Sequence, residues 1–219
     1  PCLGISYTND REVTGELAEK YPATLSLALG GSFIYLTLGV FVGVLAARYR
    51  GTFADRALVT STLIVSAIPY YLVALVSWIF LTQKYPIFPQ TTYNPFFDNP
   101  VAWAGGLLLP WLVLGLTNAT AYSRYTRGQM VETLGEDYIR TAVAKGQKEN
   151  TVIFRHALRA AIIPVVTIFG LDFGTLLGGT VFTEYIFDID GMGQWALVAV
   201  QGTPNIPVVT ATVLVAAFF

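Results

Sequence analysis

The sequence predicts an all-α integral membrane protein, a polytopic helical bundle. Hydrophobic residues make up 54% of the 219-residue chain and charged residues only 12%, which is about half the charged share usual in soluble domains. The charges gather in short segments between apolar stretches, most of which are long enough for a membrane-spanning helix of about 20 residues. We therefore expect residues 1–219 to form a single transmembrane domain.

Five apolar stretches are predicted to be spans, the last of them partial. The second is expected to kink midway, at Pro69. The fourth carries one charge, Asp172, and is rich in glycine. Residues 84–99 are proline-rich and predict a loop, and a second loop is expected at 184–205. The predicted spans are residues 22–47, 57–83, 101–123, 160–183 and 206–219.

Orientation follows from the basic residues, which mark cytoplasmic segments. Lysine and arginine concentrate in residues 48–56 and 124–159, whereas the opposite side holds only Arg11, Lys20 and Lys84. We therefore predict that both basic segments are cytoplasmic in a prokaryotic inner or plasma membrane, and that the loops at 84–99 and 184–205 lie outside. The chain begins at Pro1 rather than methionine and ends within an apolar stretch. We expect an additional helix before it, which gives six spans in a longer protein.

The polar segment at residues 132–159 is patterned as two helices. Apolar side chains pair four residues apart, Tyr138 with Ala142 and Ile139 with Val143, as on one face of a short amphipathic helix. Acidic residues open this helix and Lys145 closes it, the order that the helix dipole favours. Gly146 then stands where helices commonly end in the left-handed conformation. A second helix is expected to begin near Asn150, and the helix–glycine–helix arrangement suits docking to a partner.

Residue types that carry chemistry are few. The sequence contains no phosphate-binding loop of the Gly-x-x-x-x-Gly-Lys-Ser/Thr type, so we predict a chain that does not hydrolyse ATP and binds neither cofactor nor metal. His156 is the only histidine and is interpreted as a surface residue, and Cys2, the only cysteine, excludes an internal disulfide. Residues 188–191 superficially resemble a calcium loop, but the closing glutamate is absent.

Asp172 is costly inside a predicted span and therefore needs an explanation. Asp172 either lines a translocation path or is a structural carboxylate bonded to a neighbouring helix. The sequence leaves both interpretations open. Gly170, Gly174, Gly178 and Gly179 provide small residues for close helix packing, within this chain or against a partner.

Three pieces of the polar segment and of the span that follows it together resemble the cytoplasmic signature of ABC importer permeases, usually written Glu-Ala-Ala-x3-Gly-x9-Ile-x-Leu-Pro. They are residues 138–146, 155–159 and 163–164. Arg140-Thr141-Ala142 stands in the Glu-Ala-Ala place, a departure similar to those of the dipeptide/oligopeptide/nickel branch. Residues 22–28, 177–184 and 190–193 resemble other parts of that branch, and Leu3-Gly-Ile-Ser resembles its first, B-type permease.

The resemblance implies a permease that pairs with a second homologous permease, two ATP-binding subunits that hold ATP and Mg²⁺, and an external solute-binding protein, with peptides as cargo. It implies that Asp172 is a possible translocation-path residue. The implied contact loop for the binding protein contains Asp188, Asp190, Gly191 and Gly193. The implied coupling residues for an ATP-binding subunit are Tyr138, Ile139, Arg140, Thr141, Ala142, Val143, Lys145 and Gly146. The two apolar pairs named above are expected to form the buried side of the dock.

Three other classes of protein fit the sequence less well. An ion-coupled secondary transporter is expected to have broken helices and paired intramembrane charges, for which Asp172 alone is weak support. A membrane enzyme needs clustered histidines, carboxylates or a serine–lysine pair, which the sequence does not contain. A role of the basic segment in binding nucleic acid or anionic lipid is not needed to explain its charges, because membrane topology already explains them.

Overall fold

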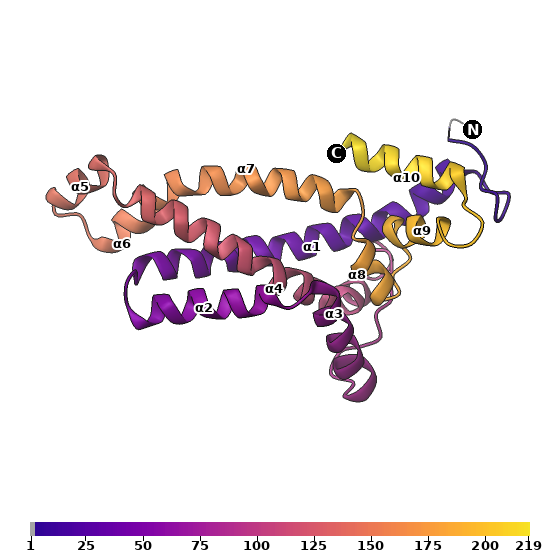
Figure 1. The fold of residues 1–219 in the computed structure, drawn as a ribbon, viewed down its shortest axis with the longest axis horizontal. Helices are drawn as coiled ribbons and strands as arrows, with labels where there is room; N and C mark the ends of the chain where they lie inside the picture. Colours follow the sequence, from indigo (N-terminus) through magenta and orange to yellow (C-terminus); the bar gives the residue numbers. More distant parts are fainter. Residues whose placement is uncertain (1–2) are drawn as a thin grey trace. The chain divides into compact units, whose positions relative to one another are not determined.

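The computed structural model describes residues 3–219, so Cys2 lies outside the described residues. The described chain is helical apart from turns, loops and an isolated antiparallel bridge between Ile5 and Glu12 (Figure 1). This confirms the all-α prediction. The elements are α1 (Val13–Arg48), α2 (Phe53–Ala67), α3 (Tyr70–Trp78), η1 (Ile79–Lys84), α4 (Pro100–Thr133), α5 (Asp137–Ala144), α6 (Glu149–Thr151), η2 (Val152–Ala157), α7 (Leu158–Leu177), α8 (Val181–Ile186), α9 (Met192–Ala199) and α10 (Ile206–Phe218), where η marks π-helical turns.

Three helical stretches are long and apolar enough to cross a membrane: α1, α4 and the continuous helix Glu149–Leu177. The pair formed by α2 and α3–η1 meets the same criterion only when taken together, and α10 is an apolar helix of 13 residues. These five correspond in order to the predicted spans. Their ends differ, because α1 begins at Val13 and continues through Pro22, and α4 continues to Thr133.

The second predicted span breaks where Pro69 was expected to kink it. Ile68 has extended backbone angles, φ −85° and ψ 125°, which is the conformation that a following proline imposes by steric conflict with its ring. Helix α2 therefore ends at Ala67 and α3 starts at Tyr70. The sequence correctly predicted the position of the interruption, and the outcome is a complete break rather than a kink.

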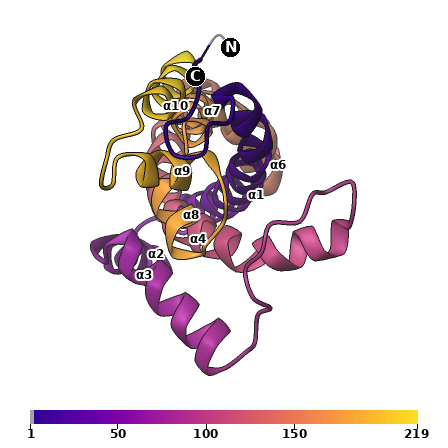
Figure 2. The same ribbon diagram turned by 90° about the vertical axis from the view of Figure 1, so that its right-hand side faces the viewer.

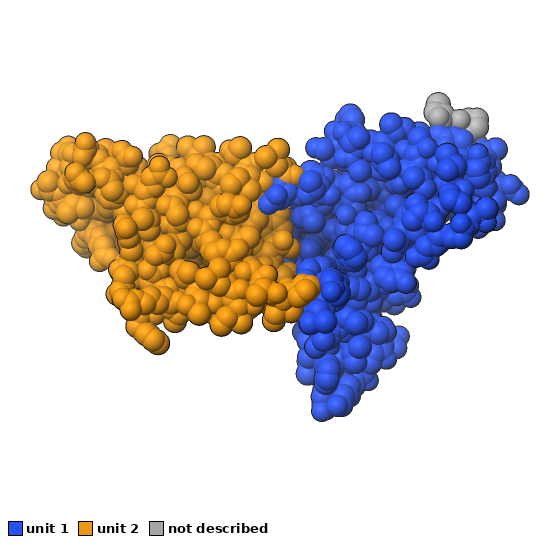
Figure 3. All heavy atoms as spheres, viewed as in Figure 1, with its two compact units in different colours: residues 1–32, 70–114, 172–219 blue, residues 33–69, 115–171 orange. Residues whose placement is uncertain are grey.

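The chain forms two compact units, coloured separately in Figure 3. Unit 1 comprises Pro1–Ser32, Tyr70–Leu114 and Asp172–Phe219, and unit 2 comprises Phe33–Pro69 and Gly115–Leu171. In unit 1, α8 packs against α9 and α9 packs against α10 (Figure 2). The segment expected to be a loop at 184–205 thus contains the second half of α8 and all of α9.

Within unit 2, α1 and α4 approach closely at two glycines. A Cβ atom added at Gly39 would lie 2.4 Å from Cβ of Tyr122, and one added at Gly43 would lie 2.7 Å from the Ser123 carbonyl oxygen. The rings of Tyr35 and Tyr122 pack beside this contact with centroids 4.7 Å apart. The four-residue glycine spacing that permits close helix crossing is therefore used here as well as in the glycine run of α7.

That glycine run is used in part as predicted. An added Cβ at Gly174 would lie 2.8 Å from the Phe219 carbonyl oxygen and one at Gly178 would lie 3.0 Å from Cβ of Ala216, so both glycines admit α10 within unit 1. Gly170 has nothing within 4 Å of such an atom. The predicted span was too long at this end, because α7 stops at Leu177 and Gly179 has a φ of +128°, a conformation that glycine adopts far more readily than other residues.

An ion pair that the sequence did not predict joins α2 to α4 in unit 2. Both carboxylate oxygens of Asp55 accept from the Arg127 guanidinium, at 2.6 Å from Nε and 2.7 Å from Nη2. The Gly51 amide also donates to Asp55, at 3.0 Å. The Asp55 side chain is 6% exposed and that of Arg127 is 28% exposed. Paired arginine–carboxylate bonds of this kind are among the stronger polar contacts in proteins.

Asp55→Ala is expected to lower the free energy of unfolding by roughly 1–3 kcal/mol, because the partly buried guanidinium loses its partner. The measurement is a thermal unfolding midpoint of the purified protein in detergent. Arg56→Ala is the control, since the neighbouring Arg56 is exposed. Equal midpoints for the two variants would contradict a stabilising role for this pair.

Candidate functional site

The predicted short helix in the polar segment forms as α5 in unit 2. Glu136 is its N-cap residue and Asp137 lies in its first turn, where negative charge is stabilised by the helix dipole. Arg140 pairs with Asp137 at 3.3 Å, and the Thr141 hydroxyl donates to the Asp137 carbonyl oxygen at 2.9 Å. These local contacts support a helix of only eight residues, which is too short to be stable on its own.

The helix ends at Gly146 as predicted. Gly146 has a φ of +75°, its amide donates to the Val143 carbonyl at 2.9 Å, and the Gln147 amide donates to the Ala142 carbonyl at 3.3 Å. This hydrogen-bond pair is the Schellman termination, in which a glycine in the left-handed region reverses the chain. Helix α6 follows from Glu149, one residue before the predicted start.

The four apolar residues of α5 are not buried in the pairs that the sequence predicted. Ile139 and Ala142 are 3% and 8% exposed, and they pack in a cluster with Met130 of α4 and Val152 and Ile153 of η2. Tyr138 and Val143 are 47% and 58% exposed. The pairs Tyr138–Ala142 and Ile139–Val143 therefore do not define one face. The hydrophobic contact that holds α5 onto its own chain uses Ile139 and Ala142.

The exposed side of α5 forms what we call the α5 surface, defined as Tyr138, Arg140, Thr141, Val143, Lys145 and Gly146. Beside it lies a cavity of ≈390 Å³ lined by Tyr138, Arg155, His156, Arg159, Ala160 and Ile163. His156 is partly exposed, and its Nε2 atom lies 2.8 Å from the Gln147 side-chain oxygen, in keeping with its interpretation as a surface residue. The α5 surface thus combines two apolar side chains with two cations, and the cavity beside it adds Arg155 and Arg159. This composition is suited to a protein partner.

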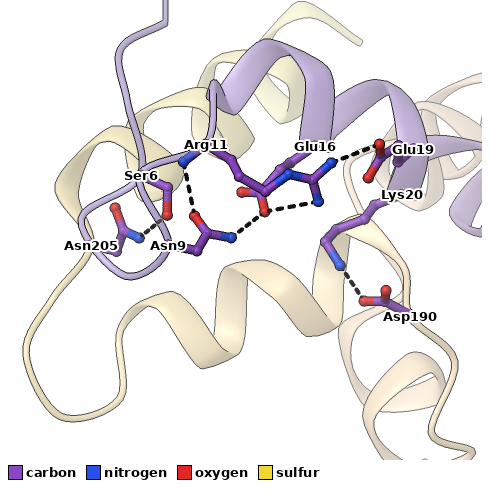
Figure 4. A network of polar contacts seen from close by, with 8 residues as sticks. All are labelled: Ser6, Asn9, Arg11, Glu16, Glu19, Lys20, Asp190 and Asn205. Atoms are coloured by element: carbon purple, nitrogen blue, oxygen red, sulfur yellow. Dashed lines mark hydrogen bonds and ion pairs between the residues drawn. The ribbon is translucent and has the colours of Figure 1, made fainter.

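The predicted outer contact loop is divided between exposed acids and buried glycines. Asp188 has a φ of +51° and accepts from the Gln194 side chain at 3.1 Å, and Asp190 pairs with Lys20 of α1 (Figure 4). Gly191 and Gly193 are buried. Of the four predicted residues, Asp188 and Asp190 are therefore exposed, and the two glycines serve the packing of α9.

Glu184 explains why Gly191 and Gly193 are needed. It was not singled out as a site residue from the sequence. Its carboxylate is completely buried in unit 1. It accepts from the Thr24 hydroxyl at 2.9 Å, from the Thr180 amide at 3.2 Å and hydroxyl at 3.0 Å, and from the Gln194 amide at 2.8 Å. A Cβ atom added at Gly191 would lie 2.5 Å from this carboxyl group. The carboxylate therefore ties α1, α8 and α9 together.

Asp172 lies on α7 and is exposed, next to Leu171, which is 72% exposed. Thr175 donates its hydroxyl to the Asp172 backbone carbonyl at 2.6 Å. The exposed position of Asp172 on α7 does not decide between the two interpretations given by the sequence, a translocation-path residue or a structural carboxylate bonded to a neighbouring helix.

Comparisons with known proteins match nearly the whole chain. The family described as "Binding-protein-dependent transport system inner membrane component" matches residues 39–219. A putative peptide transport system permease protein of Brucella abortus is 35% identical over 216 residues, 99% of this chain and 68% of the relative. The dipeptide transport system permease protein of Escherichia coli K12 is 37% identical over 238 residues, covering 98% of this chain and 70% of the relative.

The fold is also found among solved structures. The inward-facing MetNI methionine ABC transporter contains a chain with a TM-score of 0.73 to this one, covering 94% of this chain and 89% of the other. The sequence identity is 19%, so the likeness concerns the fold.

Proposed function

Because the chain belongs to the binding-protein-dependent transport system inner membrane component family, a family of multi-pass ABC importer permeases, we propose that it is a permease subunit for di- and oligopeptides. The peptide cargo follows from the printed names of the relatives, which include a di/tripeptide permease of Pseudomonas aeruginosa at 37% identity. In this proposal the chain forms a translocation path together with a second homologous permease, and Asp172 lies along it.

The observation that carries the proposal is the division of α5 into an anchored face and an exposed face. Ile139 and Ala142 fix the helix to unit 2, so a force applied to the α5 surface is transmitted to the helices behind it. In the proposed assembly, an ATP-binding subunit holds ATP and Mg²⁺ and seats the α5 surface in a groove. ATP binding then biases one of two conformations of the permease, as a ligand biases any two-state element.

The proposed topology places the α5 surface in the cytoplasm and the loops at 84–99 and 184–205 outside. A solute-binding protein would deliver the peptide to those outer loops, with Asp188 and Asp190 as exposed contacts. The permease itself supplies no catalytic group in this scheme, since ATP hydrolysis takes place on the partner subunits.

The test is purification of the full transport complex through this chain from its native membrane, followed by an ATPase assay. We expect a second permease and two ATP-binding subunits to copurify, and ATP hydrolysis to rise when the peptide-loaded binding protein is added. Uptake of radiolabelled Ala-Ala into proteoliposomes then tests the cargo. Uptake that needs an ion gradient and no ATP would contradict the proposal and favour a secondary transporter.

Val143→Asp is expected to reduce copurification of the ATP-binding subunits about tenfold or more, because a charge would be buried without a partner in the dock. Phe97→Asp is the matched control, since Phe97 is 94% exposed and lies in a loop of the proposed opposite side. Both variants should be expressed in the membrane at the parental level. Unchanged copurification with Val143→Asp would exclude Val143 from the dock.

A further inference from the structure

Unit 1 contains a cavity of ≈550 Å³ between the N-terminal segment, α1 and the chain around α9. This volume is within the range of sites that hold small ligands. One part of its lining is apolar, with Trp195, Val198 and Ala199, and the rest is polar. The polar lining includes Ser6, Thr8, Asn9, Glu16, Lys20 and Asn205.

Glu16 is the unusual member of this lining. Its side chain is 5% exposed. Its Oε1 atom accepts from the side-chain amide of Asn9 at 2.5 Å and lies 3.8 Å from Nη1 of Arg11 (Figure 4). The second oxygen, Oε2, is buried and has no hydrogen-bond partner among the described residues. An unpaired buried carboxylate oxygen is costly, and such groups are rare in native proteins. A ligand that donates a hydrogen bond to Oε2 would remove this cost.

The side chains next to the carboxylate can yield to a ligand. Asn9 is exposed and belongs to the turn around Asp10, which has a φ of 54°, and the Arg11 side chain is 55% exposed. Both are surface groups, so displacing them breaks few packing contacts. A cationic donor is favoured over a neutral one, because hydrogen bonds between charged groups are the stronger kind.

Lys20 gives the cavity a second charge of opposite sign. It is four residues after Glu16 on α1, so the two side chains lie on the same helix face about one turn apart. Its Nζ atom pairs with Asp190 (Figure 4). The same atom lies 6.0 Å from the centroid of the Trp195 ring. An anionic and a cationic group in one cavity, with amide and hydroxyl groups between, match a zwitterion whose two charged ends are separated by amide bonds.

We propose that this cavity binds a short peptide, whose α-ammonium group donates to Oε2 of Glu16 and whose chain lies along Trp195. The choice of a peptide rests on the proposed peptide cargo, whereas the ammonium group follows from the Glu16 carboxylate itself. The cavity has room for a complete small ligand, and a single lysine side chain inserted by a partner protein would fill only part of it.

The test uses the assembled transporter in nanodiscs without its binding protein, titrated with Ala-Ala and with N-acetyl-Ala-Ala by calorimetry. We expect saturable binding of Ala-Ala, and binding weaker by about tenfold or more both for the acetylated peptide and for Ala-Ala with Glu16→Gln. Glu19→Gln is the matched control, because Glu19 is exposed, lies one turn away and also contacts Arg11, at 2.9 Å. It should bind Ala-Ala as the parent does.

Three results would overturn the inference: no binding of Ala-Ala, equal binding of the acetylated peptide, or equal binding with Glu16→Gln. If the Glu16→Gln transporter fails to assemble, the Trp195→Leu variant is tested instead. Unchanged affinity of that variant for Ala-Ala would then overturn the inference. Weaker association of the solute-binding protein with Glu16→Gln, without Ala-Ala binding to the parent, would assign the cavity to a partner's lysine instead. Uptake into proteoliposomes is measured separately. ATP-driven peptide uptake without binding in this cavity would refute the peptide site proposed here and leave the proposed transport function standing.

Discussion

Replacing Gly146 with leucine is expected to lower ATP-driven uptake about 5–30-fold, the effect of losing 1–2 kcal/mol from one conformational equilibrium. Gly146 has a φ of +75°, and a residue with a Cβ atom adopts this region at a cost of roughly 1–2 kcal/mol. An added Cβ would meet nothing within 4 Å, so the expected loss arises from the helix end and the α5 surface rather than from a clash. The measurement is initial uptake of radiolabelled Ala-Ala, together with ATPase activity.

Gly146→Asn is the control for this prediction, because asparagine tolerates the left-handed conformation better than other non-glycine residues. It should retain most of the uptake, and both variants should remain inserted in the membrane. If leucine supports parental uptake and normal attachment of the ATP-binding subunits, Gly146 has no role in docking. If asparagine and leucine fail equally, the side chain itself is excluded by a partner.

Glu184→Leu is expected to lower the stability of the protein by roughly 3–5 kcal/mol, the largest effect of any single change considered. The substitution leaves the Thr180 and Gln194 amides without their acceptor in a buried region, where Glu184 is 0% exposed. Leucine also lacks the oxygen that the Thr24 hydroxyl contacts at 2.9 Å. The measurement is the thermal unfolding midpoint in detergent, followed by tryptophan fluorescence.

Asp190→Asn is the matched change for Glu184→Leu, since it removes a carboxylate from the same segment. The Asp190 side chain is 76% exposed and pairs with Lys20, and exposed pairs contribute about 0–1 kcal/mol. We expect its unfolding midpoint to stay near that of the parent. Similar midpoints for the two variants would show that Glu184 is not the group that holds α1, α8 and α9 together.

Local patterns in the sequence predicted the polar segment well. The acidic start, the glycine end and the short length of α5 depend on neighbouring residues, which the sequence displays directly. The division of its apolar residues was not predictable in this way. Tyr138, Ile139, Ala142 and Val143 are all apolar or aromatic, and only the positions of Met130 and Val152 decide which of them are buried.

The polar contacts of the structure were not predicted because their partners are far apart in the chain. Asp55 and Arg127 are separated by 72 residues and Thr24 and Glu184 by 160. No spacing rule connects such pairs in a single sequence. Asp55 and Glu184 instead stood in the charged segment 48–56 and in the predicted loop 184–205, where charged residues need no explanation. The two glycines that follow Glu184 at residues 191 and 193 were the one available indication of close packing near it.

Docking through the α5 surface is tested by site-specific crosslinking from α5 to an ATP-binding subunit. Single cysteines are placed at Val143 and at Ile139 in a chain that carries Cys2→Ser, and the assembled complex is treated with a short thiol-to-amine crosslinker. The exposed Val143 should give a crosslink to the ATP-binding subunit, and Ile139, which is 3% exposed, should give none. A crosslink from Ile139 alone, or from neither position in an ATPase-active complex, would contradict docking through the α5 surface.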